Sequence, residues 1–78
     1  MKTTYPNGTT KWQNSQDNYH RLNGPAIHYA SGTKRWFING KLHRINGPAT
    51  HYNNGAKFWF INETKYSEAD YNRILKLS

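Results

Sequence analysis

Basic and aromatic side chains are the residues of this sequence best suited to bind another molecule. Lys and Arg make up 11 of 78 residues against 4 Asp and Glu, a formal net charge of +7, and Trp, Tyr and Phe make up 15%. A cationic field of this strength favours nucleic acid, an anionic surface or an acidic protein as partner. Rings can stack on bases for about 1–3 kcal/mol each while cations contact phosphates. The residues predicted to bind nucleic acid in this way are Lys11, Arg21, Lys34, Arg35, Phe37, Arg44, Lys57, Phe58 and Phe60.

The four histidines form two recurring pairs, His20 with His43 and His28 with His51. A metal site is conceivable if the strands bring them together, but the chain has no Cys and only four acids. His20 and His43 each precede an Asn-Gly-Pro turn, which favours a hydrogen-bonding role in bracing that turn. No carboxylate pair, nucleophile–base arrangement or phosphate-binding Gly loop is present, so a ribonuclease using His and Lys is the only enzyme considered. The sequence predicts a non-enzymatic protein with no catalytic residues, no metal and no other cofactor.

Two segments of the chain align without a gap at a period of 23 residues. The motif His-Arg-x-Asn-Gly-Pro-Ala at 20–26 returns at 43–49, and Tyr-x-x-Gly-x-Lys-x-Trp at 29–36 returns at 52–59. An earlier partial copy keeps Tyr5, Gly8-Thr9 and Trp12 at an offset of 24. We expect a single domain over residues 1–78. Its expected parts are a partial repeat at 5–19, repeats at 20–42 and 43–66, and a capping helix at 67–77.

Each unit is predicted to fold as a β-hairpin. Short runs at 26–30 and 34–38 flank a turn at 31–33, in which Gly32 can adopt a positive φ. Asn39-Gly40 suits a tight hairpin turn before a third short strand at 41–44. The second copy repeats the pattern with a turn at 53–55.

The period changes at the C-terminus. Ser67 suits a helix N-cap, with acids in the first turn and bases in the last, so a helix is predicted at 67–77. Its apolar stripe would cover the last open strand edge. The stripe comprises Tyr71, Ile74, Leu75 and Leu77.

Side chains alternate along a strand, so each unit presents two faces. The rings divide into Trp12, Trp36 and Trp59 on one face and Phe37, Phe58 and Phe60 on the other. Because Trp occurs in all three copies while the opposite positions differ, we expect the Trp residues to form the core and the Phe residues to be exposed. The exposed rings have three candidate uses: a homodimer or other protein contact, nucleic-acid stacking, or packing against the C-terminal helix.

Length and composition exclude several classes of protein. A chain of 78 residues fits one small domain and no multi-domain enzyme. The lack of Cys excludes a disulfide scaffold, and no apolar stretch approaches the about 18 residues of a membrane helix. From the N-terminal residues we expect no signal peptide. We therefore expect an intracellular, cytoplasmic protein with no membrane partner.

The 23-residue unit, closed by a Ser-Glu helix, resembles the MORN-type repeat proteins of bacteria and phages over residues 5–66. The resemblance implies an all-β fold, an antiparallel β-meander of repeated hairpins with a short C-terminal capping α-helix. It also implies a binding surface without enzymatic activity. Small free-standing chains of this type look phage-like. That setting would be the cytoplasm of a bacterial host cell, where the protein would antagonise a host defence component such as an RNA-bound toxin.

Two functions are open at this point. The first is binding of RNA or other single-stranded nucleic acid, because no predicted helix suits the major groove of a duplex. Equivalent cations such as Lys34 and Lys57 would then form rows across the repeats. The second is a protein-binding or homodimerising inhibitor module that uses the Phe residues, with the basic residues complementing an acidic partner. Salt dependence separates the two functions, since phosphate contacts weaken steeply as salt rises.

Overall fold

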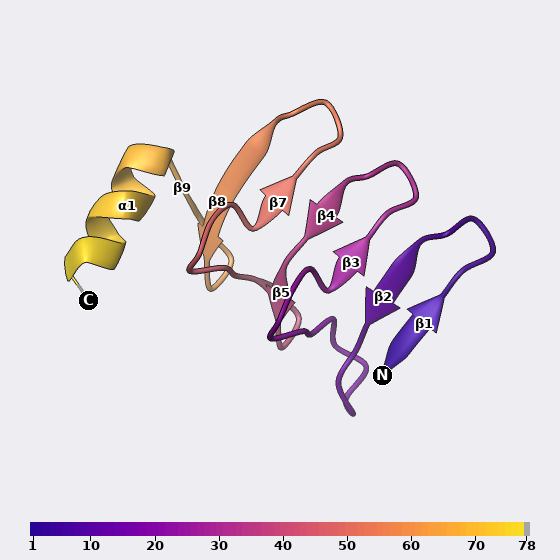
Figure 1. Ribbon diagram of the computed structural model, residues 1–78. Helices are drawn as coiled ribbons and strands as arrows, with labels where there is room; N and C mark the ends of the chain where they lie inside the picture. Colours follow the sequence, from indigo (N-terminus) through magenta and orange to yellow (C-terminus); the bar gives the residue numbers. More distant parts are fainter. Residues whose placement is uncertain (78) are drawn as a thin grey trace.

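The computed structural model describes residues 1–77, which form short antiparallel strands followed by one helix. Seven strands make one sheet in the order β1-β2-β3-β4-β7-β8-β9, and β5 pairs separately with β6. The elements are β1 (Lys2–Thr4), β2 (Thr10–Trp12), β3 (Ile27–His28), β4 (Lys34–Arg35), β5 (Phe37–Ile38), β6 (Lys41–Leu42), β7 (Thr50–His51), β8 (Lys57–Ile61), β9 (Thr64–Tyr66) and α1 (Glu68–Leu77). Figure 1 shows three hairpins side by side, with α1 beyond β9. The expected antiparallel hairpins and C-terminal helix are confirmed.

The turns of neighbouring hairpins are joined by threonine hydroxyls. The Oγ1 of Thr9 accepts a hydrogen bond from the backbone N–H of Ala30 at 3.1 Å, and the Oγ1 of Thr33 accepts one from Asn53 at 3.3 Å. Both threonines are buried, where a hydroxyl needs a partner. The partial first copy is therefore joined to the second by the same contact that joins the second to the third.

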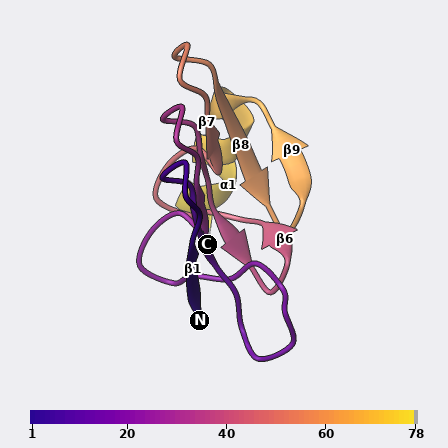
Figure 2. The same cartoon turned by 90° about the vertical axis from the view of Figure 1, so that its right-hand side faces the viewer.

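The predicted strand at 34–38 is divided in the structure. Lys34 and Arg35 pair with β7 in the main sheet, whereas Phe37 and Ile38 pair with β6. In the last unit the corresponding strand, β8, is continuous and pairs with β7 through its first half and with β9 through its second. Each of the two full units thus forms a second small hairpin, β5 with β6 in one and the second half of β8 with β9 in the other. The edge view in Figure 2 shows β6 and β9 displaced to the same side.

The expected one-sided core is wrong. The Trp residues and the Phe residues are all half-buried, so neither face is enclosed and neither is free. Four apolar residues are buried in the described part of the chain, and two of them are alanines: Ala26, Ile27, Ala49 and Tyr71. The slab measures 41 × 30 × 17 Å, and a single sheet has no second layer to cover either face. Stacked side chains on both faces take the place of a central core.

The helix begins as predicted. The Oγ of Ser67 accepts a hydrogen bond from the backbone N–H of Asp70 at 3.2 Å, and acidic residues lie in the first turn and Lys76 in the last. Tyr71 is buried and Leu75 half-buried, but Ile74 is exposed. The side chain of Leu77 lies outside the described part. Tyr71 packs against Trp59 of β8, with ring centroids 6.4 Å apart, so the helix covers the ring and not only the strand edge. Over residues 1–77, no helix is both long enough and apolar enough to cross a membrane.

Candidate functional site

The strand register divides the nine predicted binding residues between two faces. Lys11, Arg35 and Phe58 lie in one cross-strand row, whereas Lys34 and Lys57 lie in the neighbouring row that faces the other way. We call the side with the three Trp residues the Trp face and the opposite side the Phe face. A single ligand strand therefore cannot contact all nine residues at once.

On the Trp face, each repeat stacks an arginine on the tryptophan of the preceding unit. The guanidinium carbon of Arg21 lies 3.7 Å from the ring centroid of Trp12, and that of Arg44 lies 3.8 Å from Trp36. The Nζ of Lys2 approaches Trp12 at 5.2 Å. Cation–π contacts of this kind contribute about 0.5–2 kcal/mol, so Arg21 and Arg44 bind the protein itself as well as adding positive charge.

Each of these arginines lies across the Asn-Gly-Pro loop that follows it in the sequence. The Nη1 of Arg21 donates to the carbonyl of Pro25 at 3.3 Å, and the Nη1 of Arg44 donates to that of Pro48 at 3.1 Å. A Cβ on the intervening glycine of either loop would lie 3.2 Å from the guanidinium carbon, so a larger residue would push the arginine away by a few tenths of an ångström. Partial burial lowers the pKa of Arg44. The guanidinium nevertheless keeps its charge at any physiological pH.

The histidines brace turns, but not the turns expected. The Nδ1 of His20 accepts a hydrogen bond from the backbone N–H of Asn39 at 3.0 Å, and the Nδ1 of His43 accepts one from Asn62 at 3.1 Å. Each histidine therefore holds the tight turn 19 residues ahead, while the arginine beside it holds the Asn-Gly-Pro loop. Across residues 1–77, no three His, Cys, Asp or Glu side chains cluster closely enough to hold a metal ion.

On the Phe face, the cations lie between or over aromatic rings of the same chain. The Nζ of Lys11 lies 5.1 Å from the ring centroid of Tyr5 and 5.5 Å from that of Tyr19. A hydrogen bond from Lys11 to the Tyr19 hydroxyl, at 3.4 Å, raises the pKa of Lys11.

Arg35 and Lys65, the next two cations of the Phe face, also lie against aromatic rings. The guanidinium of Arg35 lies 5.7 Å from Tyr29 and 5.8 Å from Tyr52, and Lys65 lies 4.4 Å above Phe58. The Phe rings are also covered from within the chain. Phe37 contacts Tyr19 with ring centroids 5.4 Å apart, and Phe58 contacts Tyr52 at 5.7 Å. Phe60 lines a cavity of about 220 Å³ together with Arg35, Leu42, Thr50, Tyr52, Phe58 and Lys65.

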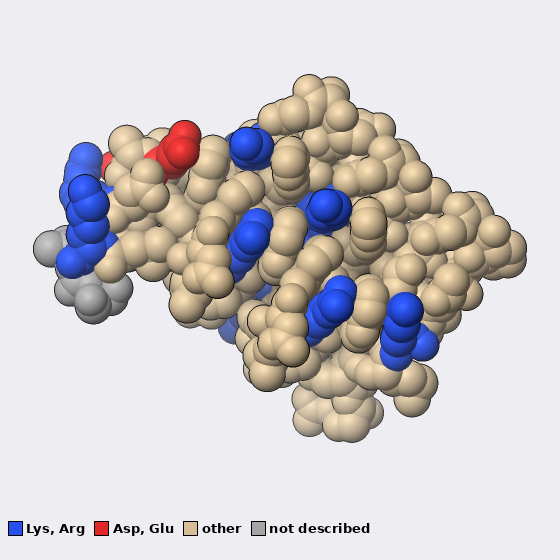
Figure 3. Space-filling model, in the orientation of Figure 1, with Lys and Arg blue, Asp and Glu red and all other residues tan. Residues whose placement is uncertain are grey.

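Within residues 1–77, most charged side chains take part in no ion pair. In the described residues the ion pair is that of Arg73 with Asp70, at 3.4 Å on the exposed surface of α1. The side chains of Lys34 and Lys57 have no ion pair, hydrogen bond or ring contact within residues 1–77, and His28 and His51 alternate with them in the same cross-strand row. Figure 3 shows Lys and Arg side chains spread over one face between ridges of uncharged side chains, with acidic groups gathered near α1.

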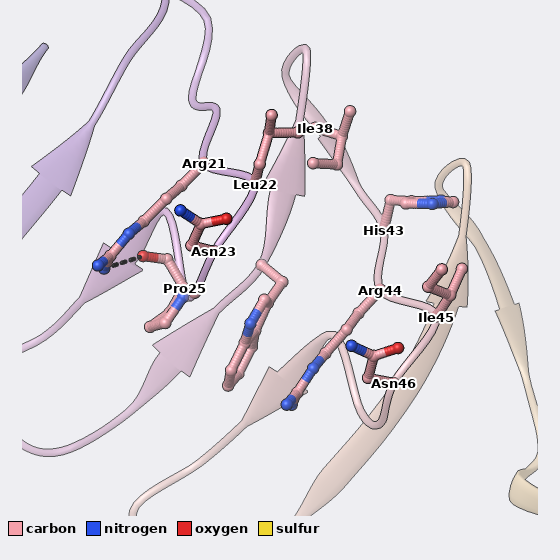
Figure 4. Close-up of a pocket in the computed structure, with 11 residues that line it drawn as sticks. Arg21, Leu22, Asn23, Pro25, Ile38, His43, Arg44, Ile45 and Asn46 are labelled. Atoms are coloured by element: carbon pink, nitrogen blue, oxygen red, sulfur yellow. Dashed lines mark hydrogen bonds between the residues drawn. The ribbon is translucent and has the colours of Figure 1, made fainter.

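Two exposed aliphatic residues were missed by the sequence reasoning. Leu22 is 77% exposed and Ile45 is 58% exposed, and each stands between Arg and Asn in the repeated motif. They line a groove of about 860 Å³ between loops 21–25 and 43–46, with Trp36 among its lining residues. Figure 4 shows Arg21 and Arg44 extending in the same direction from these loops. The signal was available in the sequence, since an aliphatic residue recurs within an otherwise polar turn.

Comparison with known proteins gives no match: neither a family model, nor a curated protein, nor a solved structure is significantly similar to this chain.

Proposed function

We propose that this chain is a non-enzymatic protein that binds single-stranded RNA through its Trp face. The proposal is carried by the cross-strand row of Lys34 and Lys57 with His28 and His51. Its two ammonium groups have no internal partner among the described residues, and no acidic residue shares the row. An unpaired ammonium is free to replace the counterions of a phosphate, and counterion release provides much of the affinity for nucleic acid.

The position of the row suits an extended single strand. Lys34 and Lys57 are separated by β7, so they are two strand spacings apart, about 9–10 Å. Arg21 and Arg44 add charge along the same face beside the half-buried Trp rings. Because Arg21, Arg44 and Tyr71 already lie against the Trp rings, the proposal depends on phosphate contacts and not on base stacking. The first turn of α1 is acidic, which does not suit entry into a duplex groove.

The Phe face is the weaker candidate for stacking and for a homodimer seam. Its rings already contact Tyr19, Tyr52 and Lys65 of the same chain. Association through Phe37 and Phe60 stays a prediction, to be checked by sedimentation of the Phe37→Ser/Phe60→Ser variant. We also propose the MORN-type repeat architecture for residues 5–66, supported by the equivalent bonds of the two Asn-Gly-Pro loops. The phage and host-defence setting stays a prediction.

The test is the salt dependence of binding to a fluorescein-labelled single-stranded RNA, measured by anisotropy between 50 and 200 mM salt. If Arg21, Lys34, Arg44 and Lys57 contact phosphates, the log–log slope is about −2.8, and this fourfold rise in salt weakens binding about 50-fold. The Lys34→Gln/Lys57→Gln variant should halve the slope to about −1.4, so that the same rise weakens binding about sevenfold.

The matched control removes the same charge elsewhere. Lys65→Gln/Lys76→Gln changes one cation of the Phe face and one of α1, and should keep the slope of the unmodified protein. Equal slopes for the two double variants would refute the Trp-face assignment, and no binding at 50 mM would refute RNA as the ligand.

A further inference from the structure

The groove between loops 21–25 and 43–46, here the first groove, has a counterpart one repeat later. The second groove lies between loop 45–48 and α1, and it is smaller, about 460 Å³ against about 860 Å³. Trp36 lines the first groove and Trp59 the second. The helix therefore stands where a further Asn-Gly-Pro loop would otherwise bound the second groove.

Tyr71 of α1 crosses the second groove and binds the loop on its far side. Its hydroxyl donates to the backbone carbonyl of Arg44 and accepts a hydrogen bond from the backbone N–H of Gly47 at 3.2 Å. Only 2% of Tyr71 is exposed. The loop thus presents an acceptor and a donor that converge on one oxygen atom, an arrangement suited to a hydroxyl, which can donate and accept at once.

The loop of the first groove presents the same two groups. Within residues 1–77, nothing forms a hydrogen bond with the carbonyl of Arg21 or the N–H of Gly24, the counterparts of Arg44 and Gly47. The two loops have matching internal contacts, since each arginine bonds to its own proline carbonyl and lies 3.2 Å from the Cβ position of its own glycine. Both loops therefore present a backbone carbonyl and a backbone N–H to which one hydroxyl can bind.

The two grooves also correspond in one aliphatic side chain each, Ile45 in the second and Leu22 in the first. In the second groove, Ile45 lies with Leu75 of α1, four residues after Tyr71, among the lining residues. In the first groove the equivalent side chain is Leu22, which is 77% exposed. A leucine one helical turn after a tyrosine lies on the same face of a helix, so it would reach Leu22 when the tyrosine reaches loop 21–24.

The charge of the first groove specifies the character of its partner. Arg21, His43 and Arg44 line it, and no acidic residue does. By contrast, α1 brings acids beside its tyrosine, with Glu68 lining the second groove. Arg44 already stacks on Trp36, so an incoming ring would contact the Arg44 guanidinium, a favourable contact for an aromatic side chain.

We propose that the first groove binds a helical segment of a partner protein that carries a tyrosine, a leucine four residues later, and acidic residues near the tyrosine. The tyrosine hydroxyl would bond to the carbonyl of Arg21 and the N–H of Gly24, and the leucine would pack on Leu22. The first groove is not lined by Lys34 or Lys57, so the Lys34→Gln/Lys57→Gln variant, which weakens RNA binding, should still bind the helical segment.

The chain itself supplies the probe. A capped peptide with the sequence of residues 67–77, SEADYNRILKL, is titrated into the isotope-labelled full chain and followed by NMR. We expect the amide of Gly24 and the indole N–H of Trp36 to shift in a saturable manner, while those of Gly47 and Trp59 stay unchanged. The same peptide with Tyr71→Phe should bind about threefold to tenfold more weakly, the effect of one or two hydrogen bonds.

A change in the protein gives the second readout. Leu22→Ser, at an exposed position that leaves the fold intact, should weaken peptide binding, whereas Tyr5→Ser, an exposed apolar position on the first hairpin, should not. The proposal is overturned if Gly24 and Trp36 do not shift, if the shifts fall on Gly47 and Trp59, or if the Tyr and Phe peptides bind equally. It is also overturned if a short oligoribonucleotide shifts the Gly24 amide and the peptide does not.

Discussion

The hydroxyl of Tyr71 should provide a large share of the stability of the C-terminal end. It satisfies the carbonyl of Arg44 and the N–H of Gly47, and the side chain is 2% exposed. Tyr71→Phe keeps the ring against Trp59 and removes only these hydrogen bonds. Leaving a buried polar group unsatisfied costs about 1–3 kcal/mol, so we expect a loss of about 2 kcal/mol. For a domain of this size, this loss lowers Tm by about 8–16 °C.

The assay is thermal unfolding followed by circular dichroism, with Tyr66→Phe as the matched control. Tyr66 is half-buried in β9, and its hydroxyl has no hydrogen-bond partner in the described residues. Its substitution should change the free energy of unfolding by less than about 0.5 kcal/mol, as for most changes that break no specific contact. Equal decreases in Tm for the two variants would refute the reasoning, because the hydroxyl of Tyr71 would then carry no special weight.

Three further changes test the repeated contacts. Arg44→Lys should lower the free energy of unfolding by about 1–2 kcal/mol in urea titrations, because an ammonium cannot both stack flat on Trp36 and hold the loop; an unchanged midpoint would contradict the stacking role. Glu63→Gly should raise stability by about 0.5–1 kcal/mol, because Glu63 has a φ of 71° where Gly bears no Cβ penalty; a lower Tm would count against strain at this turn. His20→Ala should speed hydrogen exchange at the Asn39 amide, which loses its acceptor; unchanged exchange would show that the imidazole does not brace the turn.

The local chemistry of turns and caps was sufficient to predict much of the fold. Asn39 and Gly40 have φ values of 50° and 81°, as a tight hairpin turn requires. Gly32, at 101°, occupies the predicted hairpin turn of its unit, and Ser67 caps the helix. These features depend on one or a few neighbouring residues, so a sequence reveals them directly.

The arrangement of the faces could not be predicted in the same way. Alternation along a strand correctly separates Trp36 from Phe37, but it does not say whether either side is enclosed. That depends on which groups return from elsewhere in the chain, such as Arg44 onto Trp36 and Tyr71 onto Trp59. The division of the strand at 34–38 likewise depends on pairing with β6, which competes with the main sheet for Phe37.

The candidate site was predicted in composition but not in geometry. The cations Lys34 and Lys57 do form one row, as the repeat indicated. Arg35 and Phe58 face the opposite side, where they contact Tyr52. These contacts with Tyr52 could be recognised only from the cross-strand register.

The most direct measurement is an NMR titration of the aromatic-labelled protein with a short single-stranded oligoribonucleotide at low salt. The reporters are the imidazoles of His28 and His51 on the Trp face and the rings of Tyr52 and Phe58 on the Phe face. We predict that the imidazole resonances shift in proportion to bound RNA while the Tyr52 and Phe58 resonances stay in place. Shifts confined to Tyr52 and Phe58 would contradict binding through the Trp face.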